Sequence, residues 1–508
     1  MGKGGKIGGY LTFCVLLSLV YVYWGQLSEN FQLTYAHRSL SELDLGSAPL
    51  KAVTLYKNGF STGGVQMQVG ADLLAGKSGR ELAEYFSQFI EVEAVQEAEA
   101  ATDGSTGSAH GAVSSVADRV YNGNGKVMQT YQDIKEGDRL YVVAPGLLFV
   151  FPFVKLGHRV YLTSTESPTQ KPVVLESLTE SPRTFHVHNF FSYDEADKLI
   201  KRISEIDDEH NRLQQSHVGH QNGKKLVSKH RTSENAFDQV SETAVAIRKR
   251  VFDILALGDF QEDMCDGLQL LRYKQKQAYI AHTDYFDKHT TSEWNWDPSR
   301  GGSNRFATVF LYLSNVTRGG QTVFPNAGMP EGLPSEYDHP ANAKESQDLG
   351  MSLFDKGSWE VDMVQKCSTQ LAAYPRKGHA ILFYSQKPNG ELDPMSLHGG
   401  CPVLDGTKWG ANLWVWNKRR YGLDESHGAS KEFSVTFQNP TDKKVDVYWS
   451  STLMTTIEPH GKTLYTTFDD HKWTLKHGER VVLEFTGKAD DGKSQTVVVP
   501  LESVKDEL

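Results

Sequence analysis

The sequence has few cysteines and no segment rich in lysine or arginine. It contains 4 cysteines in 508 residues, too few for a disulfide scaffold. Cys265, Cys367 and Cys401 lie beyond the N-terminal apolar segment, so one bridge and one free thiol can form, and the sequence does not say which. The net charge of −10 and the lack of a basic run argue against nucleic-acid binding as the main function.

Long hydrophobic runs are also scarce. One mostly apolar run, from Tyr10 to Trp24, is shorter than the roughly 20 residues of a full membrane span but suits a thin bilayer. Lys3 and Lys6 precede it and predict an uncleaved signal anchor over residues 1–26, with its N-terminus in the cytosol. A cleaved signal peptide is the alternative, although no convincing small-x-small cleavage site follows.

The C-terminus predicts the compartment. Lys505-Asp-Glu-Leu508 matches the signal by which a receptor retains proteins in the endoplasmic reticulum. Together with the N-terminal segment it predicts a single-pass type II membrane protein with a lumenal catalytic portion, or a free lumenal protein if the leader is cleaved. Asn315-Val-Thr317 is the one sequon without proline and a candidate glycosylation site.

After a predicted lumenal stem (27–50), residues 51–145 show a ββαββ pattern. A capping box at Ser78-Gly-Arg-Glu81 opens a helix expected to reach Ile90, and a polar loop follows at 93–116. The element order resembles a ubiquitin-like β-grasp, and the Asn-Gly hairpin at 122–125 is similar to doublecortin-like modules. This resemblance implies a structural or protein-docking role.

The central region begins as two helices and continues as short strands. We expect a linker with strands over 146–181, including a buried strand at 147–153, and a catalytic domain over 182–421. Helices at about 192–207 and 240–255 precede many β-type segments, which predicts helices packed on a double-stranded β-helix, or jelly roll. Residues 326–365 are polar and predict an insertion or lid. The predicted fold class is α+β.

Three side chains in this region have the chemistry of a ferrous site. His282 and Asp284 are two residues apart, on one face of an extended strand, and His398 comes from far along the chain. Two histidines and a carboxylate occupy one face of an octahedral iron ion and leave positions for a bidentate cosubstrate and dioxygen. Lys408 supplies a positive charge that suits the distal carboxylate of 2-oxoglutarate.

Two alternative roles for these residues stay open. A hydrogen-bonded core cluster would leave Lys408 and the glycine pair after His398 without a purpose. A zinc hydrolase uses similar ligands, but it usually displays a His-Glu-x-x-His helix, which this sequence lacks.

The residues around the triad carry a family resemblance. They closely resemble the catalytic domain of the collagen-type and plant or algal prolyl 4-hydroxylases, and the segments that carry the resemblance are Tyr273-Lys-Gln-Lys-Gln277, Arg305-Phe-Ala-Thr308, Gly319-Gly-Gln-Thr322, Lys377–Tyr384, Ser396-Leu-His398 and Gly406-Thr-Lys-Trp409. The resemblance implies a dioxygenase that uses Fe(II), 2-oxoglutarate and oxygen to hydroxylate peptidyl proline at carbon 4. Succinate and carbon dioxide are released, and ascorbate keeps the iron reduced.

Carried over residue by residue, the resemblance assigns further roles. His282, Asp284 and His398 would bind iron, and the cosubstrate would be held by Lys408, Tyr273 and Thr322 and walled by Trp409. Arg231 and Arg305 are suggested for contact with a proline-rich peptide. Lys276 and Gln321 depart from the glycine and glutamate that the family commonly has. Hydroxylation of another side chain, such as lysine, and a non-catalytic lumenal adaptor are the competing functions.

Residues 430–504 alternate in a β pattern and predict a small sandwich of about six strands. The framework from Asn439 to Trp473 resembles the β-domain of the von Hippel-Lindau tumour suppressor, which binds hydroxyproline. The positions that match its pocket are Trp449, Thr467, His471 and Trp473, and its pocket tyrosine has no clear counterpart. The resemblance implies either recognition of the hydroxylated product or a purely structural sandwich.

Overall fold

The computed structural model describes residues 50–501 apart from 93–115, 163–164, 207–212, 216, 222–223, 228–231, 289–294, 333–339, 421–431, 450–451, 469–470, 489–490 and 493. The predicted anchor and stem, nearly all of the polar loop at 93–116 and the retention signal lie outside the described residues. Within the described ranges, no helix is both long and apolar enough to cross a membrane.

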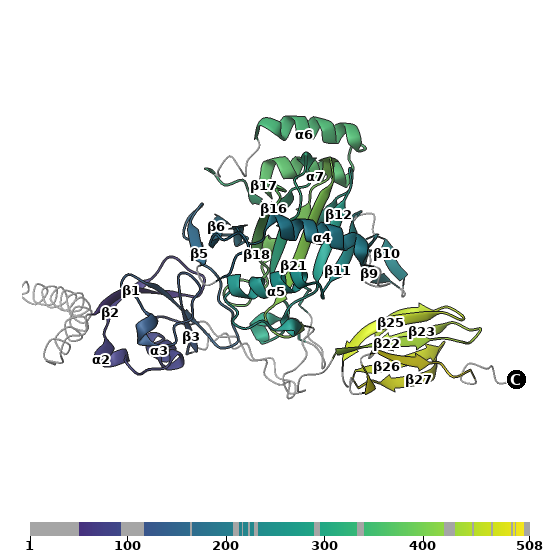
Figure 1. Cartoon of the computed structure of the whole chain (residues 1–508), viewed down its shortest axis with the longest axis horizontal. Helices are drawn as coiled ribbons and strands as arrows, with labels where there is room; N and C mark the ends of the chain where they lie inside the picture. Colours follow the sequence, from purple (N-terminus) through teal and green to yellow (C-terminus); the bar gives the residue numbers. More distant parts are fainter. Residues whose placement is uncertain are drawn as a thin grey trace, which may run out of the picture.

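The N-terminal domain is a four-stranded sheet with a helix on one face (Figure 1). Its strands have the order β2-β1-β4-β3, and the first and last strands in sequence, β1 and β4, pair in parallel. Helix α3 begins at the Ser78 capping box but ends at Phe86, before the expected Ile90. The elements are β1 (Lys51–Lys57), β2 (Val65–Val69), α2 (Ala71–Leu74), α3 (Gly79–Phe86), β3 (Arg119–Asn122), η1 (Tyr131–Asp133) and β4 (Arg139–Val143).

The prediction of a buried strand at 147–153 is wrong. The segment is buried, but it pairs with no sheet. A side chain takes over part of the role of a neighbouring strand: Asn58 Oδ1 accepts from Val150 N at 3.0 Å, and Asn58 Nδ2 donates to Leu148 O at 2.8 Å. Asn58 Nδ2 also donates to Pro388 O at 3.1 Å, so one side chain joins the N-terminal domain to the catalytic domain.

The catalytic domain is built on a nine-stranded sheet of order β5-β6-β7-β18-β14-β21-β12-β11-β8. Its first two strands come from residues 146–181, so this region is not a linker but part of the domain. The strands are β5 (Arg159–Leu162), β6 (Val173–Thr179), β7 (Thr184–His188), β8 (Gln214–Gln215), β11 (Glu234–Asp238), β12 (Leu268–Tyr273), β14 (Arg305–Tyr312), β18 (His379–Tyr384) and β21 (Lys408–Trp416).

A second, four-stranded sheet of order β13-β19-β16-β17 completes the jelly roll. Alternate residues of β14 belong to different cores: Val309 and Leu311 to the large one, Phe310 and Tyr312 to a smaller one shared with Phe324 of the second sheet. The strands are β13 (Tyr279–His282), β16 (Thr322–Gly328), β17 (Gln370–Ala373) and β19 (His398–Gly400), with the short pairs β9 (His217–Gln221) and β10 (Lys224–Val227), and β15 (Arg318–Gly319) and β20 (Val403–Asp405).

The polar stretch 326–365 is largely helical. After the end of β16, helices α6 (Pro340–Leu353) and α7 (Trp359–Thr369) pack against each other (Figure 1). Buried Met363, Val364 and Cys367 anchor α7, which contacts β16 and β17. The sequence predicted an insertion or lid here but not its helices, because the apolar periodicity of this stretch is weak.

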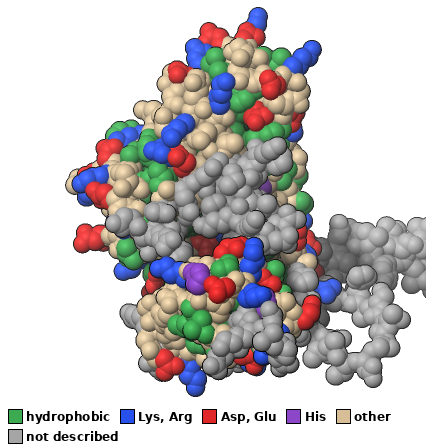
Figure 2. All heavy atoms as spheres, turned by 90° about the vertical axis from the view of Figure 1, so that its right-hand side faces the viewer, with side chains coloured by type: hydrophobic (Ala, Val, Ile, Leu, Met, Phe, Trp, Pro, Cys, Tyr) green, Lys and Arg blue, Asp and Glu red, His purple; other side chains and the backbone are tan. Residues whose placement is uncertain are grey.

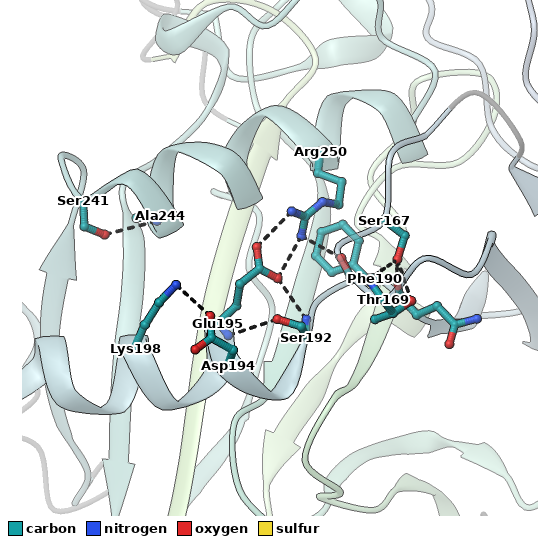
Figure 3. Close-up of polar contacts among 11 residues, drawn as sticks. Ser167, Thr169, Phe190, Ser192, Asp194, Glu195, Lys198, Ser241, Ala244 and Arg250 are labelled. Carbon is teal, nitrogen blue, oxygen red and sulfur yellow. Dashed lines mark hydrogen bonds and ion pairs between the residues drawn. The ribbon is translucent and has the colours of Figure 1, made fainter.

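Two amphipathic helices, α4 (Tyr193–Glu205) and α5 (Glu242–Ile254), lie across the large sheet (Figure 1). Figure 3 shows Arg250 of α5 facing Glu195 in the first turn of α4. The Arg250 guanidinium donates to Glu195 Oε1 at 2.9 Å and to Phe190 O at 2.7 Å, and Glu195 also accepts from Ser192 N in a capping box. Both charged side chains are nearly buried, so this ion pair fixes how the helices meet.

We predict that Arg250→Leu lowers the free energy of unfolding by about 3 kcal/mol, because it leaves a buried carboxylate and a buried carbonyl without their donor. Urea unfolding followed by tryptophan fluorescence measures the change. Lys198→Leu is the matched control: it breaks the exposed Lys198–Asp194 pair on the same helix and should change nothing measurable. If both variants lowered the free energy of unfolding by the same amount, the greater stabilisation assigned to the buried ion pair would be contradicted.

The C-terminal module consists of two sheets of three and four strands, drawn in yellow in Figure 1. It contains one strand that the sequence pattern did not predict, β24, and β22 pairs in parallel with β28. On the face shown in Figure 2, basic and acidic side chains are intermingled. The strands are β22 (Glu432–Gln438), β23 (Val445–Trp449), β24 (Thr452–Ile457), β25 (Lys462–Phe468), β26 (Lys472–His477), β27 (Arg480–Thr486) and β28 (Ser494–Val498).

Candidate metal and cosubstrate site

Strand pairing brings the three predicted metal ligands together. His282 ends β13, His398 begins β19, and the two residues are direct partners in an antiparallel pair. Asp284 follows β13 by two residues. His282 Nε2 lies 3.6 Å from Asp284 Oδ1, and His398 Nε2 lies 3.4 Å from Asp284 Oδ2. Ligand atoms that share one ion at bonds of ~2.1 Å lie roughly 3 Å apart, so this arrangement is close to that of a loaded site.

Hydrogen bonds orient each ligand. The ring atom Nδ1 of His282 is 2.9 Å from Ile280 O, and Nδ1 of His398 is 3.0 Å from Ser396 O. Since a carbonyl can only accept, each Nδ1 carries the proton and each Nε2 keeps its lone pair for a metal. The Thr308 hydroxyl donates to Asp284 Oδ2 at 2.7 Å, which fixes the carboxylate.

The charge states also suit a metal. Burial would raise the pKa of Asp284, but the imidazoles of His398 and His282 hold it well below its usual range, so the group is a carboxylate. Burial lowers the pKa of His398 to about 4, so this imidazole is neutral at pH 7. Metals bind carboxylates and neutral imidazoles, so neither Asp284 nor His398 has to lose a proton before an ion enters.

A cavity of about 400 Å³ opens beside the ligands. This volume lies in the range of about 300–1,000 Å³ that is usual for small-molecule sites. The cavity wall combines aromatic and aliphatic side chains with a similar number of polar and charged ones. The lining residues are Phe237, Gln269, Leu271, Tyr273, Tyr279, His282, Thr283, Asp284, Phe286, Arg305, Phe310, Thr322, Phe383, His398, Gly399, Gly400, Lys408, Asn412 and Trp414.

Lys408 is a buried cation in this wall. Its side chain is almost inaccessible, and its Nζ lies 4.7 Å from the ring centroid of Phe310 and 5.2 Å from that of Tyr273. No carboxylate among the described residues pairs with it, and burial lowers the pKa of Lys408 to about 7. A carboxylate that entered the cavity would offset this cost of burial.

Two of the three other predicted cosubstrate contacts lie near Lys408. Tyr273 is its direct partner across β12 and β21, and Tyr273 and Thr322 both line the cavity. Tyr312 Oη lies 2.8 Å from the Thr322 hydroxyl and 3.2 Å from Ala373 O, and these contacts fix the position of Thr322 in the cavity wall.

The prediction that Trp409 walls the cavity is wrong. Successive side chains of a strand point to opposite faces, so Lys408 and Trp409 cannot both face the cavity. Trp409 instead packs against the large hydrophobic core, and the guanidinium of Arg272 lies 5.5 Å from its ring centroid. Trp414, which the sequence pattern did not single out, lines the cavity.

Of the two arginines suggested for substrate contact, Arg231 lies outside the described residues. Arg305 lines the cavity and donates to Asp284 O at 3.1 Å. Its guanidinium lies 3.9 Å from the Trp414 ring centroid and forms an ion pair with Asp266 at 3.0 Å. The sequence did not reveal Asp266, because its role depends on a partner 39 residues away.

A disulfide between Cys367 and Cys401 ties α7 to the residue that follows β19, three residues after His398. Cys265 is the buried free thiol. The sequence left this pairing open because the two cysteines are 34 residues apart.

Lys276 and Gln321, which replace the glycine and glutamate of the resembled family, both have unusual local structure. Lys276 has φ of +69°, a left-handed conformation that glycine adopts most easily. Gln321 is buried, and its Oε1 has no hydrogen-bond partner among the described residues.

The exposed sequon residue Asn315 accepts from Lys377 N at 3.0 Å, and its glycosylation stays a prediction.

Comparisons with known proteins agree with this site. A model of the 2OG-Fe(II) oxygenase superfamily matches residues 268–416, a range that contains all three ligands and Lys408. Prolyl 4-hydroxylase 2 of Arabidopsis thaliana is 35% identical over 272 residues, which cover 53% of this chain and 79% of the plant protein.

The chain belongs to the prolyl 4-hydroxylase family.

Other members of the prolyl 4-hydroxylase family are also similar. Probable prolyl 4-hydroxylase 3 of the same plant is 34% identical over 245 residues, which cover 47% of this chain and 71% of that protein. Among solved structures, the viral collagen prolyl hydroxylase of Paramecium Bursaria Chlorella virus-1 in its 2OG complex is 21% identical, covers 46% of this chain and 95% of that chain, and gives a TM-score of 0.29.

The residues of this prolyl 4-hydroxylase family member fit Fe(II) and 2-oxoglutarate. Two imidazole nitrogens and one carboxylate oxygen lie within 4.8 Å of one another and border the cavity, so one side of an ion would stay open. The buried lysine without an acidic partner fits a dicarboxylate cosubstrate.

We predict that Thr308→Val weakens Fe(II) binding about 10- to 100-fold, because the Asp284 carboxylate loses the hydroxyl that orients it. Anaerobic calorimetric titration of the purified protein measures the affinity. Thr308→Ser keeps the hydroxyl and should bind Fe(II) almost as tightly as the parent. Unchanged affinity in the valine variant would show that Thr308 does not support the metal ligand.

Proposed function

We propose that this protein hydroxylates peptidyl proline to 4-hydroxyproline. One oxygen atom of O₂ enters the proline C–H bond and the other enters 2-oxoglutarate, which is released as succinate and CO₂. The observation that carries the proposal is a buried lysine without an acidic partner in the same cavity wall as two histidines and an aspartate. Iron, when bound, supplies the oxidising chemistry with O₂.

The chain's own residues would bind the cosubstrate, orient the substrate proline and keep water out of the cavity. Lys408 would hold the distal carboxylate of 2-oxoglutarate, and Thr322, which lines the same cavity, would add a hydroxyl contact. Phe286 and Trp414 line the same cavity with flat apolar surfaces, which suit a proline ring. A polyproline II peptide already has little conformational freedom, so binding it in such a site costs less entropy.

The compartment and the other partners are part of the same proposal. The apolar segment 10–24 and the terminal Lys505-Asp-Glu-Leu508 support membrane anchoring and receptor-mediated retention in the endoplasmic reticulum, with the substrate among proline-rich secretory proteins. Ascorbate would keep the iron reduced. Cell-wall-type glycoproteins and collagen-like proteins both remain candidate substrates. The N-terminal domain, which resembles a ubiquitin-like or doublecortin-like module, would serve as a docking or structural part.

Release of succinate tests the proposal. The full chain, supplied with Fe(II), 2-oxoglutarate, ascorbate and a proline-rich peptide, should release succinate only when the peptide is present, and mass spectrometry should find 4-hydroxyproline. A lysine-containing peptide without proline tests the lysyl alternative. Turnover that is absent or independent of peptide would favour the non-catalytic adaptor.

We predict that Lys408→Met raises the KM for 2-oxoglutarate on the order of 100-fold, because a buried carboxylate would lose its cation. Steady-state kinetics at saturating peptide measure it. Lys274→Met is the matched control, since this exposed lysine follows the same strand, β12, that carries Tyr273, and it pairs with Glu234. A KM that rises equally in both variants, or in neither, would contradict the assigned role of Lys408.

A second function, binding of hydroxyproline, is supported by the C-terminal module. Its four predicted residues lie together: Trp473 Nε1 donates to Thr467 Oγ1 at 3.0 Å, and that hydroxyl lies 3.2 Å from His471 Nδ1. The rings of Trp449 and His471 are 5.1 Å apart. Tyr465 lies against Trp473 with ring centroids 4.8 Å apart, so an aromatic residue from another position enlarges the cluster. This arrangement supports the resemblance to the von Hippel-Lindau β-domain.

We predict that the full-length protein without 2-oxoglutarate binds a hydroxyproline peptide more tightly than the matching proline peptide. His471→Ala should remove about 1–3 kcal/mol of this preference, which corresponds to lost hydrogen bonding. Fluorescence titration measures both affinities. His477→Ala is the matched control: His477 ends β26, the strand that begins directly after His471, its Nδ1 contacts Lys444 O, and the variant should keep the preference. Equal binding of both peptides would leave only a structural role for the module.

A further inference from the structure

Asn412 occupies a central position in the cavity wall. It lies on β21 between Lys408 and Trp414, and alternation along the strand puts all three on the cavity side. Its neighbours across the sheet, Gln269 on β12 and Phe310 on β14, also line the cavity. Asn412 is 7% exposed, so its carboxamide has little access to bulk water.

The Asn412 carboxamide has no partner within the described part of the chain. Its Oδ1 is buried without a hydrogen bond, and no described residue donates to or accepts from the side chain. A buried polar group without a partner costs about 1–3 kcal/mol. Two other polar groups of the cavity wall do have partners, since Asp284 bonds to Thr308 and Thr322 bonds to Tyr312. Asn412 is therefore available to whatever enters the cavity.

The hydrogen-bonding groups of a carboxamide indicate which kind of ligand can pair with Asn412. It offers both a donor and an acceptor, whereas 2-oxoglutarate offers only acceptors. Along the strand, Asn412 lies four residues, ~13 Å, from Lys408 but only two residues, ~7 Å, from Trp414, so it is nearer to the part of the wall assigned to substrate. A main-chain peptide group has one donor and one acceptor and can satisfy both ends of the carboxamide. Proline cannot, because its nitrogen carries no hydrogen.

We propose that Asn412 pairs with a main-chain peptide group of the substrate and selects prolines that have a non-proline neighbour in the cavity. The inference rests on the proposed function. The substrates that it predicts are peptides in which proline alternates with residues that carry a backbone N–H. An uninterrupted polyproline run supplies carbonyls but no N–H and leaves the Asn412 oxygen without a donor. Such runs are the poorer substrates.

Two peptides of identical sequence test the proposal, one of them N-methylated at every residue other than proline. With the full-length enzyme, N-methylation should lower kcat/KM roughly 5- to 150-fold, the equivalent of one unsatisfied buried group. In Asn412→Leu, which has a similar volume but no polar atoms, the ratio between the two peptides should fall close to 1. The KM for 2-oxoglutarate should not change.

Gln321→Leu is the matched control, since Gln321 is also a buried carboxamide with an unpartnered oxygen but does not line the cavity. It should keep the parental ratio. Equal turnover of both peptides by the parent would overturn the inference even if no variant folded. A ratio that stays high in Asn412→Leu would show that N-methylation acts by size, and a raised KM for 2-oxoglutarate would assign Asn412 to the cosubstrate. No succinate with either peptide would instead refute the proposed function.

Discussion

The pairing of β13 with β19 is the contact on which the site depends. It joins two histidines that are 116 positions apart in the numbering and makes them direct cross-strand partners. Asp284 then needs only two further residues to reach the same point, and the Thr308 hydroxyl on the opposite sheet fixes its carboxylate. Because both sheets of the jelly roll contribute, the metal ligands are correctly placed only when the sheets are packed face to face.

Burial gives the site its selectivity for charge. Asp284, His398 and Lys408 are each more than nine-tenths buried, and a buried charge without a partner is costly. The carboxylate lies beside two imidazoles, while the lysine ammonium lies near the rings of Tyr273, Phe310 and Tyr312 and forms no ion pair with any described residue. Among the described residues, Lys408 has no acidic partner and Asn412 Oδ1 has no hydrogen-bond donor. The metal ligands, Lys408 and Asn412 are therefore three separate binding groups, which would suit a metal, a dicarboxylate and a peptide group.

The sequence predicted those parts of the site whose chemistry is rare. The combination of His282, Asp284, His398 and Lys408 is unusual, so the types and spacing of these residues were enough to predict a metal and cosubstrate site. Trp409 was wrongly assigned to the cavity. Successive side chains of a strand point to opposite faces, so a tryptophan directly after Lys408 could have been expected to face away from the cavity. Asp266 and the Cys367–Cys401 bridge were missed or left open because their partners are distant in sequence. The strands of 146–181 were taken for a linker for the same reason, since membership of a sheet is decided by neighbours that a local pattern does not reveal.

The most direct test of the account is an anaerobic crystal structure of the full chain soaked with Fe(II) and 2-oxoglutarate. Anomalous scattering at the iron edge should give one peak within bonding distance of His282 Nε2, Asp284 and His398 Nε2. Density for 2-oxoglutarate should place one carboxylate against Lys408 Nζ. Iron bound elsewhere, or a cosubstrate that leaves Lys408 without a partner, would contradict the assignment of this cavity as the catalytic site.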